Sequence, residues 1–366
     1  MNSLDFISQT KTTLSSAEWI DNPEILPKVS IVIPTYNESQ YIKKCIDAIL
    51  MQDYPLESLE IHVVDGNSED NTLDLVHQHF IDQKMPVTVH MNPNRKTPTG
   101  LNIGVGKSTG DVVIILGAHA ELYPGFIRRN VENLRIPGVV CSGGTQVNLG
   151  ESPKQISIGV VMSHWFGMAT APHRYQKKPG KVHTVAYGAY RKDLFKEIGY
   201  FEEEGSIAED AELNWRIIQA GYDIYFDPDV KARYYPRKTF VKFAYQMYRY
   251  GILRAYMFRK HFEGLSFLHF IPPGFLLTLV GLVAGSIFNR VPQILLAVLL
   301  LIYGGLVTIF GLLAWRVEKR ARPMLISWAF VSMHLAWALG FIIGVISRKT
   351  FFKEYVLSSR NHERSP

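Results

Sequence analysis

Val29-Ser30-Ile31-Val32-Ile33-Pro34-Thr35-Tyr36-Asn37-Glu38 and Ile61-His62-Val63-Val64-Asp65-Gly66-Asn67-Ser68 decide the fold, because each is a short apolar run that stops at polar, turn-forming residues. Apolar runs of this length, rich in β-branched residues, are typical of buried parallel strands. Ligands of open α/β sheets bind beyond the carboxyl ends of such strands. We therefore expect both polar clusters to lie at one binding edge.

Strand-like and helix-like segments alternate along the first third of the chain. Strands are predicted at 29–34, 60–64, 86–90 and 111–116, and helices at 39–52, 70–80 and 98–108. A βα repeat predicts a mainly parallel, Rossmann-like α/β sheet with right-handed crossovers. Ser68 and Asp70 stand where the second helix should begin, so we expect both to cap it.

The two strand ends resemble those of the family-two glycosyltransferases, which are inverting enzymes with a GT-A fold. In that family the Pro-Thr-Tyr-Asn-Glu turn and the aspartate after the following strand hold the nucleotide of a nucleotide-sugar donor. The resemblance implies donor binding by Pro34, Tyr36, Glu38, Asp65, Arg95 and Asn102. The alternative for Asp65 is an aspartate that closes its own turn through backbone amides. Gly66 departs from the acidic residue often found next in relatives.

The strand at 111–116 ends differently from the family pattern. Relatives carry Asp-x-Asp, whose carboxylates meet the ribose and a divalent metal that neutralises the departing diphosphate, whereas this chain has Gly117-Ala118-His119. A subgroup resembling the succinoglycan glucosyltransferases also has histidine at the second place, but usually keeps the first aspartate. Imidazole binds Mn²⁺ and Mg²⁺ prefers oxygen, so His119 as a ligand favours Mn²⁺, or a shell shared with Glu121 or diphosphate oxygens. The alternative is a histidine that only hydrogen-bonds the donor or the backbone.

The acidic pair Glu209-Asp210, at the start of a predicted helix, resembles the acceptor-side motif of the same family. A sugar hydroxyl is a poor nucleophile, so inverting transfer needs a carboxylate that takes its proton during attack on the anomeric carbon. The resemblance implies that Asp210 is this general base, with Glu209 beside it at the acceptor. The alternative is helix N-terminal charge, which accounts for Glu212.

Two other motifs have weaker signatures. Gly104-Val105-Gly106-Lys107-Ser108 looks like half of a phosphate-binding loop, but Leu101 stands where its first glycine should be, so we expect these glycines to let a helix pack closely on the sheet. Gln246-Met247-Tyr248-Arg249-Tyr250 resembles the Gln-x-x-Arg-Trp motif of membrane polysaccharide synthases. It implies that Gln246, Arg249 and Tyr250 hold the diphosphate and the acceptor; an ordinary interfacial helix is the alternative.

The 366-residue chain is 47% hydrophobic, and its surplus apolar residues lie toward the C-terminus. Three uncharged runs, at 267–288, 291–315 and 324–346, each approach the length of about 20 residues that spans hydrocarbon. Basic and aromatic residues are interleaved just before them, which suits a membrane interface and makes lipid, not nucleic acid, the expected partner. We predict a polar N-terminal segment at 1–27, a GT-A catalytic domain at 28–236, an interfacial helical segment at 237–264, a membrane domain at 265–347 and a basic tail at 348–366.

The orientation in the membrane follows from the charges. Residues 1–27 lack the apolar core of a signal peptide, which predicts a cytosolic catalytic domain. The loop at 316–322 is basic and should also be cytosolic. A third span would then place the tail outside, yet Arg348, Lys349, Lys353 and Arg360 make that tail basic, so its orientation stays open.

Together with these features, the resemblance implies a multi-pass enzyme of the plasma (inner) membrane that moves a sugar, from a uridine diphosphate donor, to a lipid-linked or saccharide acceptor in exopolysaccharide or cell-surface glycan synthesis. Polysaccharide-assembly proteins are further expected partners. Three spans are fewer than a polymer channel needs, so single transfer is favoured over a processive synthase. Gly117 leaves open a non-catalytic nucleotide-sugar-binding partner of a synthase. A nucleotidyltransferase is disfavoured, because no glycine-rich basic loop follows the first strand. Cys45 and Cys141 receive no role.

Overall fold

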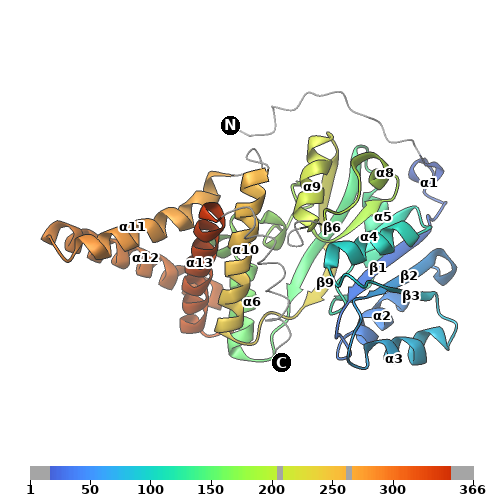
Figure 1. Cartoon of the computed structure of the whole chain (residues 1–366), viewed down its shortest axis with the longest axis horizontal. Helices are drawn as coiled ribbons and strands as arrows, with labels where there is room; N and C mark the ends of the chain where they lie inside the picture. Colours follow the sequence, from blue (N-terminus) through green and yellow to red (C-terminus); the bar gives the residue numbers. More distant parts are fainter. Residues whose placement is uncertain (1–16, 204–208, 261–265, 348–366) are drawn as a thin grey trace. The chain divides into compact units, whose positions relative to one another are not determined.

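The computed structural model describes residues 17–203, 209–260 and 266–347 (Figure 1). The chain forms two compact units, one from Met1–Val147 and Gln176–Tyr234 and the other from Asn148–Tyr175 and Tyr235–Pro366. The predicted basic tail, most of the predicted N-terminal segment and the predicted junction near 264 lie outside the described residues.

Four parallel strands form one half of the sheet in the first unit. They are β1 (Val29–Thr35), β2 (Leu59–Asp65), β3 (Val87–Met91) and β4 (Val112–Ile115), in the order β3-β2-β1-β4. They match the four predicted strands to within one residue at each end. The predicted parallel sheet is therefore confirmed in this half.

The helices between these strands also follow the prediction. They are α2 (Ile42–Leu50), α3 (Thr72–Val76) with its π-helical continuation η2 (His77–Ile81), and α4 (Thr97–Lys107). Asp70 Oδ1 accepts the backbone N–H of Thr72 (3.0 Å), the first residue of α3, but the N-cap position itself is Asn71 and not Asp70. The capping prediction is wrong for Ser68, whose hydroxyl donates to Asp65 instead.

The other half of the sheet is antiparallel, which the βα repeat did not predict. It comprises β5 (Glu121–Leu122), β6 (Val139–Asn148), β7 (Gly180–Val182), β8 (Ala186–Arg191) and β9 (Asp223–Tyr234). The order continues β4-β8-β6-β9-β5, with β7 also paired to β9. The remaining helical elements of this unit are α1 (Glu18–Asp21), η1 (Leu56–Ser58), α5 (Phe126–Asn133), α8 (Leu194–Ile198) and α9 (Glu209–Gln219).

Successive side chains of a strand point to opposite faces of the sheet. Both faces of this sheet are apolar, and helices cover each of them. Ile31 and Ile33 of β1 belong to one buried cluster, which includes Ile42 and Ile46 of α2. Val32 of β1 belongs to a second cluster, which includes α4 and α9 through Leu101, Val105, Leu213 and Ile217. Strand-end residues are consequently held between two packed layers.

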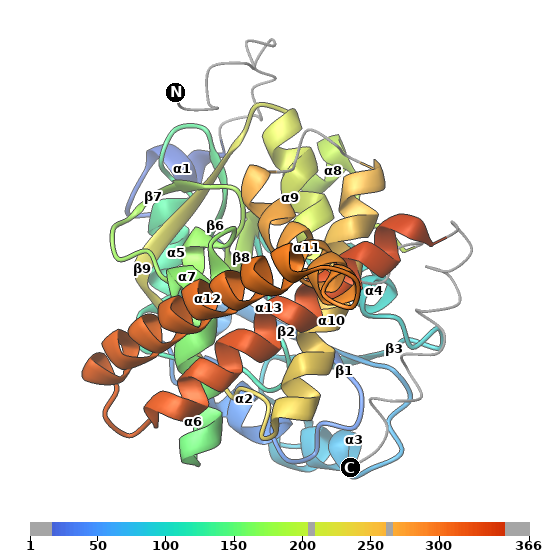
Figure 2. The ribbon, with the colours of Figure 1, turned by 90° about the vertical axis from the view of Figure 1, so that its left-hand side faces the viewer.

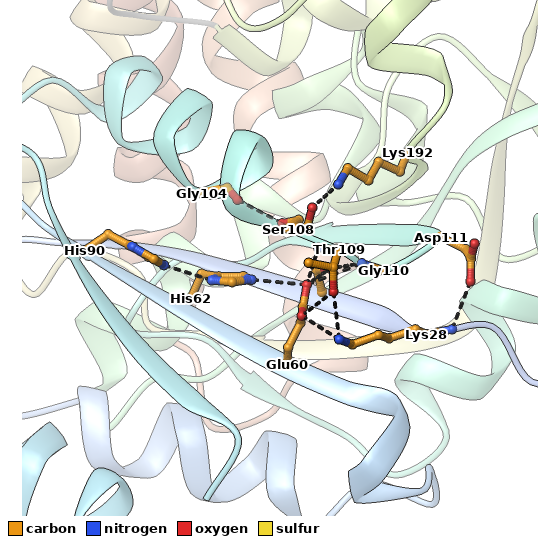
Figure 3. Close-up of polar contacts among 11 residues, drawn as sticks. Lys28, Glu60, His62, His90, Gly104, Ser108, Thr109, Gly110, Asp111 and Lys192 are labelled. Atoms are coloured by element: carbon orange, nitrogen blue, oxygen red, sulfur yellow. Dashed lines mark hydrogen bonds and ion pairs between the residues drawn. The ribbon is translucent and has the colours of Figure 1, made fainter.

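A polar cluster ties together the beginnings of β1, β2 and β4 (Figure 3). The Glu60 carboxylate accepts hydrogen bonds from Lys28 Nζ (2.8 Å), Ser30 Oγ (2.6 Å) and the Thr109 hydroxyl (2.7 Å). His62 Nε2 lies 3.2 Å from Glu60 Oε1. Because these residues stand at the amino ends of the strands, the cluster lies away from the binding edge and serves the fold.

The second unit is helical. Its elements are α6 (Pro153–Met162), α7 (Trp165–Met168), η3 (Pro172–Arg174), α10 (Phe240–Lys260), η5 (Phe267–Phe270), α11 (Ile271–Gly285), α12 (Arg290–Val317) and α13 (Pro323–Ile346). Three helical segments, Phe267–Gly285, Arg290–Val317 and Pro323–Ile346, are long and apolar enough to cross a membrane, in agreement with the three predicted runs. The predicted domain 28–236 included residues 148–175, but α6 and α7 belong to this second unit because their apolar side chains pack among its helices.

Candidate active site

The turns that follow β1 and β2 are joined by hydrogen bonds. Asn37 N–H donates to Ser68 Oγ (2.9 Å), and Glu69 N–H donates to Asn37 Oδ1 (2.8 Å). Asn37 adopts a left-handed φ of 54°, which a short side chain that hydrogen-bonds locally tolerates. The two polar clusters therefore lie side by side at the carboxyl ends of the parallel strands, as the sequence predicts.

Asp65 lies inside this pair of turns and is fully buried. Its two carboxylate oxygens accept the backbone N–H (2.8 Å) and the hydroxyl (2.5 Å) of Ser68. These hydrogen bonds replace those to water that the carboxylate loses when it is buried. A Cβ on Gly66 would lie only 3.3 Å from Thr35 O and 3.4 Å from the Tyr36 ring, so the acidic residue of relatives would be crowded here. Asp65 thus closes its own turn, the alternative that the sequence left open.

Arg95 and Tyr36 meet at the same edge. The Arg95 guanidinium carbon lies 5.5 Å from the centre of the Tyr36 ring, within the range of a cation–π contact. Its Nη1 also lies 3.3 Å from Glu69 Oε1. The structure therefore brings Tyr36, Arg95 and the two strand-end turns together, and it leaves a cation beside an aromatic face where a donor's phosphates and base are expected.

Asn102 has a different position from the other predicted donor residues. Its side chain bonds both ways to the Phe201 backbone, donating to Phe201 O (2.9 Å) and accepting from Phe201 N–H (2.9 Å). Its amide also donates to Glu203 Oε1 (3.0 Å), and Thr99 Oγ1 donates to Glu203 Oε2 (3.0 Å). Asn102 therefore holds Phe201 and Glu203 against α4, and it does not contact the strand-end turns. Sequence reasoning missed Glu203; its only signal is its place shortly before the acidic pair.

His119 and Glu38 form a pair next to Gly117. His119 Nδ1 lies 3.5 Å from Glu38 Oε1, and the imidazole is 43% exposed. A Cβ on Gly117 would be 3.7 Å from His119 Cε1 and 3.8 Å from Nε2, which is ordinary van der Waals contact. The imidazole thus lies beside the space that a side chain at position 117 would enter. Tyr41 and Tyr234 flank the ring, with centroids 6.4 and 6.2 Å away.

The surroundings of this pair are acidic. Burial raises the pKa of the Cys45 thiol, and the charges of Glu38 and Glu121 raise it further, so both carboxylates lie near one buried point below the loop. Glu121, which the sequence offered as a second metal ligand, pairs with Arg233 at 2.9 Å. No cluster of three or more metal-ligating side chains occurs within the described ranges. His119 with Glu38 fits a divalent cation only if ligand oxygens, such as those of a diphosphate, complete the shell.

Asp210 occupies the first turn of α9 with an exposed side chain, and its Oδ1 accepts the backbone N–H of Ala211 (2.7 Å). Burial raises the pKa of the Tyr190 hydroxyl well above its usual value, and the charges of Cys141 and Asp210 add to this effect. The Asp210 carboxylate therefore lies close to β8 and β6. The structure thus places this exposed carboxylate at the start of α9, beside the buried sheet.

A buried ion pair fixes the helix that carries Asp210. Glu212 and Arg216 meet at 2.8 Å, and Arg216 also donates to the carbonyls of Ile198 and Tyr200. Asn214 donates to Thr184 Oγ1 (3.0 Å). These contacts give Glu212 a structural role in holding α9.

Tyr187 is a further residue that the sequence did not single out. It lies in β8 with φ of 53°, a conformation that bulky side chains rarely adopt. The pairing of β8 with β6 shifts register at the same place, between Ser142 and Gly144. Strain of this kind often accompanies functional sites, and no local sequence signal reveals it.

Gln246, Arg249 and Tyr250 lie on α10 of the second unit, at positions that share one helix face. Gln246 is buried, and its amide donates to the Tyr250 hydroxyl (3.3 Å). Two of the three motif residues, Gln246 and Tyr250, therefore contact each other along α10.

Comparison with known proteins identifies the family of this chain. The sequence model of Glycosyl transferase family 2 matches residues 30–199. The dolichyl N-acetyl-alpha-D-glucosaminyl phosphate 3-beta-D-2,3-diacetamido-2,3-dideoxy-beta-D-glucuronosyltransferase of Methanococcus voltae is 32% identical over 265 residues, which cover 70% of this chain and 81% of that protein. The succinoglycan biosynthesis protein ExoA of Rhizobium meliloti (strain 1021) is 28% identical over 326 residues, or 85% of this chain and 93% of its own.

Among solved structures, the mannosyltransferase PcManGT from Pyrobaculum calidifontis, determined with GDP-Man and Mn²⁺, superimposes with a TM-score of 0.64 at 20% identity. The match covers 90% of this chain and 90% of that chain. At this identity the likeness establishes the fold alone, and it agrees with the predicted GT-A architecture followed by C-terminal apolar helices.

Proposed function

Because this chain belongs to glycosyl transferase family 2 and is a glycosyltransferase, we propose that it is a membrane-anchored inverting enzyme that transfers a sugar from a nucleotide-diphosphate donor to a lipid-linked or saccharide acceptor. The observation that carries the proposal is the joined pair of turns after β1 and β2, with Arg95 over Tyr36 beside them. A guanidinium and an aromatic ring at strand ends suit a nucleotide diphosphate.

We assign Pro34, Tyr36, Glu38, Asp65 and Arg95 to the donor side. Asp65 acts by fixing the turn through Ser68, and only about two of its four acceptor positions are used by that contact. The donor that we propose is a uridine diphosphate sugar. Guanosine donors are the ones to compare, because the mannosyltransferase from Pyrobaculum calidifontis is in complex with GDP-Man.

A bound Mn²⁺ would neutralise charge on the departing diphosphate. The residues that would hold it are His119 and Glu38, 3.5 Å apart. Arg95 would hold phosphate oxygens as a cation that needs no metal. The Mn²⁺ bound with the mannosyltransferase belongs to that protein, but it supports the same test here.

Asp210 is the general base of the proposed reaction. Its carboxylate takes the proton of the acceptor hydroxyl while the acceptor oxygen bonds to the anomeric carbon and the bond from that carbon to the diphosphate oxygen breaks. Glu209 lies beside it on the acceptor side. From the resemblance of their motif, we assign Gln246, Arg249 and Tyr250 to the diphosphate and the acceptor.

The acceptor class and location are part of the same proposal. The name of the Methanococcus voltae relative describes a dolichyl-phosphate-linked acceptor, and that of the Rhizobium meliloti relative describes succinoglycan synthesis. These names support a lipid-linked or polymer acceptor at a membrane surface. We place the catalytic unit on the cytosolic side of the inner membrane, because nucleotide sugars are its proposed donors.

The test is nucleotide release and sugar transfer by the detergent-solubilised full chain, with uridine and guanosine diphosphate sugars, with and without Mn²⁺ or Mg²⁺. Asp210→Asn should lower turnover by about 10²- to 10⁴-fold, the usual contribution of a general base, without changing donor affinity. The matched control, Glu209→Gln, removes the adjacent charge and should cost less. Tight donor binding without turnover on any acceptor extract would favour the second candidate, a non-catalytic nucleotide-sugar-binding partner, which Gly117 in place of the usual aspartate supports.

A further inference from the structure

The last apolar helix, α13, is packed differently from the two before it. Among the three membrane-span candidates, 39% of the most apolar window of α13 is buried, against 11% for each of the others. In Figure 1, α11 and α12 project together from the second unit, while α13 runs across their base beside α10. Length and composition alone would treat the three helices as equals.

The second half of α13 runs beside α10 in the same direction. A Cβ on Gly340 would lie 2.0 Å from Tyr248 O, and a Cβ on Gly344 would lie 2.5 Å from Ala255 Cβ, so the two backbones are in close contact (Figure 2). Arg259 donates to the Ser347 carbonyl where both helices end. Small residues four apart allow such approach between helices. The stretch of α10 from Tyr248 to Arg259 therefore lies at the same depth as the end of α13.

That stretch of α10 cannot lie in hydrocarbon. Its cations are Arg249, Arg254, Arg259 and Lys260. Each Arg or Lys at the centre of a bilayer costs about 2.5–3.5 kcal/mol on insertion scales and more in other treatments. Basic and aromatic residues on one helix suit the headgroup region instead. The end of α13, held against them, shares that position.

The first half of α13 is covered by α6 and α7. Arg322 N–H, at the start of α13, donates to Ser157 Oγ of α6 (3.4 Å). Farther along, His334 Nε2 lies 2.9 Å from the Phe166 carbonyl of α7, and a Cβ on Gly167 would lie 3.0 Å from Met333 Sδ. These partners are short segments of the chain between β6 and β7, and neither is long enough to cross a membrane. Both halves of α13 are thus packed against other elements of the second unit.

The geometry points to α13 as a helix that lies along the membrane surface, while the α11–α12 hairpin enters the bilayer. An upright α13 of 24 residues, about 36 Å long, would place Arg322 and Ser347 on opposite sides and would draw the cations of α10 across with it. The inference rests on the membrane anchoring proposed above and not on the transferase chemistry.

The hairpin has the exposed apolar surface that lipid requires. Its large exposed side chains include Leu277, Val280, Leu301 and Ile302, each 59% or more exposed. Phe275 of α11 and Tyr303 of α12 pack with ring centroids 4.5 Å apart, which holds the pair together. With α13 on the surface, the loop at 318–322 and the chain after Ser347 lie on the same side of the bilayer. The basic tail then no longer conflicts with the positive-inside tendency.

The experiment is cysteine sidedness in sealed inner-membrane vesicles of known orientation, with a membrane-impermeant maleimide and the full chain. Lys319→Cys reports the loop before α13, Asn289→Cys reports the hairpin tip, and Ser347→Cys reports the end of α13. The native Cys45 and Cys141 are fully buried, so background labelling should be low. We expect Ser347→Cys to react from the same face as Lys319→Cys and opposite to Asn289→Cys. Reaction of Ser347→Cys from the face of Asn289→Cys would overturn the inference.

A second measurement decides the case in which Ser347→Cys reacts from neither face. An epitope is inserted between Ser347 and Arg348, and protease is then added to one face of the membrane and, in a separate sample, to the other. Loss of the epitope from the Lys319 side supports a surface helix, and loss from the other side overturns it. Failure of the whole chain to stay with the vesicles would instead overturn the membrane anchoring, and the transfer assay with Asp210→Asn tests the chemistry separately.

Discussion

The imidazole of His119 lies 3.5 Å from the Glu38 carboxylate, and this pair joins the turn after β1 to the loop after β4. In the family pattern, the loop after β4 carries two aspartates. Here a glycine and a histidine replace them, and the carboxylate is supplied from another strand end. An acidic group thus remains at this edge of the sheet although the local motif has lost both of its own.

Gly117→Asp should strengthen activation by Mn²⁺, because its Cβ would stand in ordinary contact with the His119 ring and its carboxylate would add an oxygen ligand nearby. His119→Ala should weaken the activation by about 10- to 100-fold, a range seen for residues that support metal sites. The measurement is the Mn²⁺ concentration that gives half-maximal nucleotide release. Gly117→Ala is the control for steric change. Equal Mn²⁺ dependence in wild type and His119→Ala would remove His119 from the metal site.

Glu203→Ala should lower the rate of transfer to the acceptor, while the free energy of unfolding should fall only by the small contribution of its hydrogen bonds. The carboxylate holds its segment to α4 through Thr99 and Asn102, and each such bond contributes about 0.5–1.5 kcal/mol to stability. Asn102→Ala should have a similar effect. The loss of unfolding free energy in the double variant should be smaller than the sum of the losses in the two single variants. Steady-state kinetics for donor and acceptor with thermal unfolding of each variant measures this. A rise in donor KM alone in Asn102→Ala would restore the donor-binding role that the sequence predicts.

Gly104→Ala and Gly106→Ala form a matched pair on α4. A Cβ on Gly104 would lie 2.2 Å from Val32 Cγ1, so Gly104→Ala should destabilise the first unit by about 1–3 kcal/mol. Gly106 has nothing within 4 Å of its added Cβ, so Gly106→Ala should stabilise by about 0.5–1 kcal/mol. Thermal unfolding compares them. Loss of donor affinity in a stabilised Gly106→Ala would revive the phosphate-loop interpretation.

Glu60 should make the first unit sensitive to acid. Burial alone would raise the pKa of its carboxyl, but hydrogen bonds from Lys28, Ser30 and Thr109 outweigh this and hold the pKa well below its usual range. A depressed folded pKa adds stability that is present above the unfolded value of about 4.3 and is lost as pH falls toward the folded pKa. Glu60→Gln should therefore unfold at lower temperature than wild type at pH 7.

The difference between the two proteins should shrink as pH falls from about 5 to about 3, since acid favours protonation of this carboxyl in the unfolded chain and removes the advantage of the folded one. Thermal unfolding of both proteins across this range measures it. Glu57→Gln, on an exposed stretch of η1, is the control and should follow wild type at every pH. Parallel melting curves for Glu60→Gln and wild type throughout this range would show that the cluster of Figure 3 contributes no acid-sensitive stability.

Much of the first unit could be predicted because its signals are local. The apolar runs at 29–34 and 60–64 stop at turn residues, and this is enough to locate β1, β2 and the binding edge at their ends. The antiparallel pairing was not predicted, since β6, β8 and β9 pair across long stretches of chain and no repeat reveals their order. Within the site, turn closure by Asp65 was predicted only as an alternative, and Glu203 was missed because its contacts lie on a distant helix.

The sequence by itself determined the family, the strand-end turns and the three apolar helices, because motifs, hydrophobic period and helix length are properties of neighbouring residues. Only the tertiary structure decided that Glu38 faces His119, that Asn102 holds Glu203, and that α6 and α7 belong with the C-terminal helices. The same holds for the packing of α13 against α10. Each of these depends on contacts between residues far apart in the chain, whose free energy no local pattern encodes.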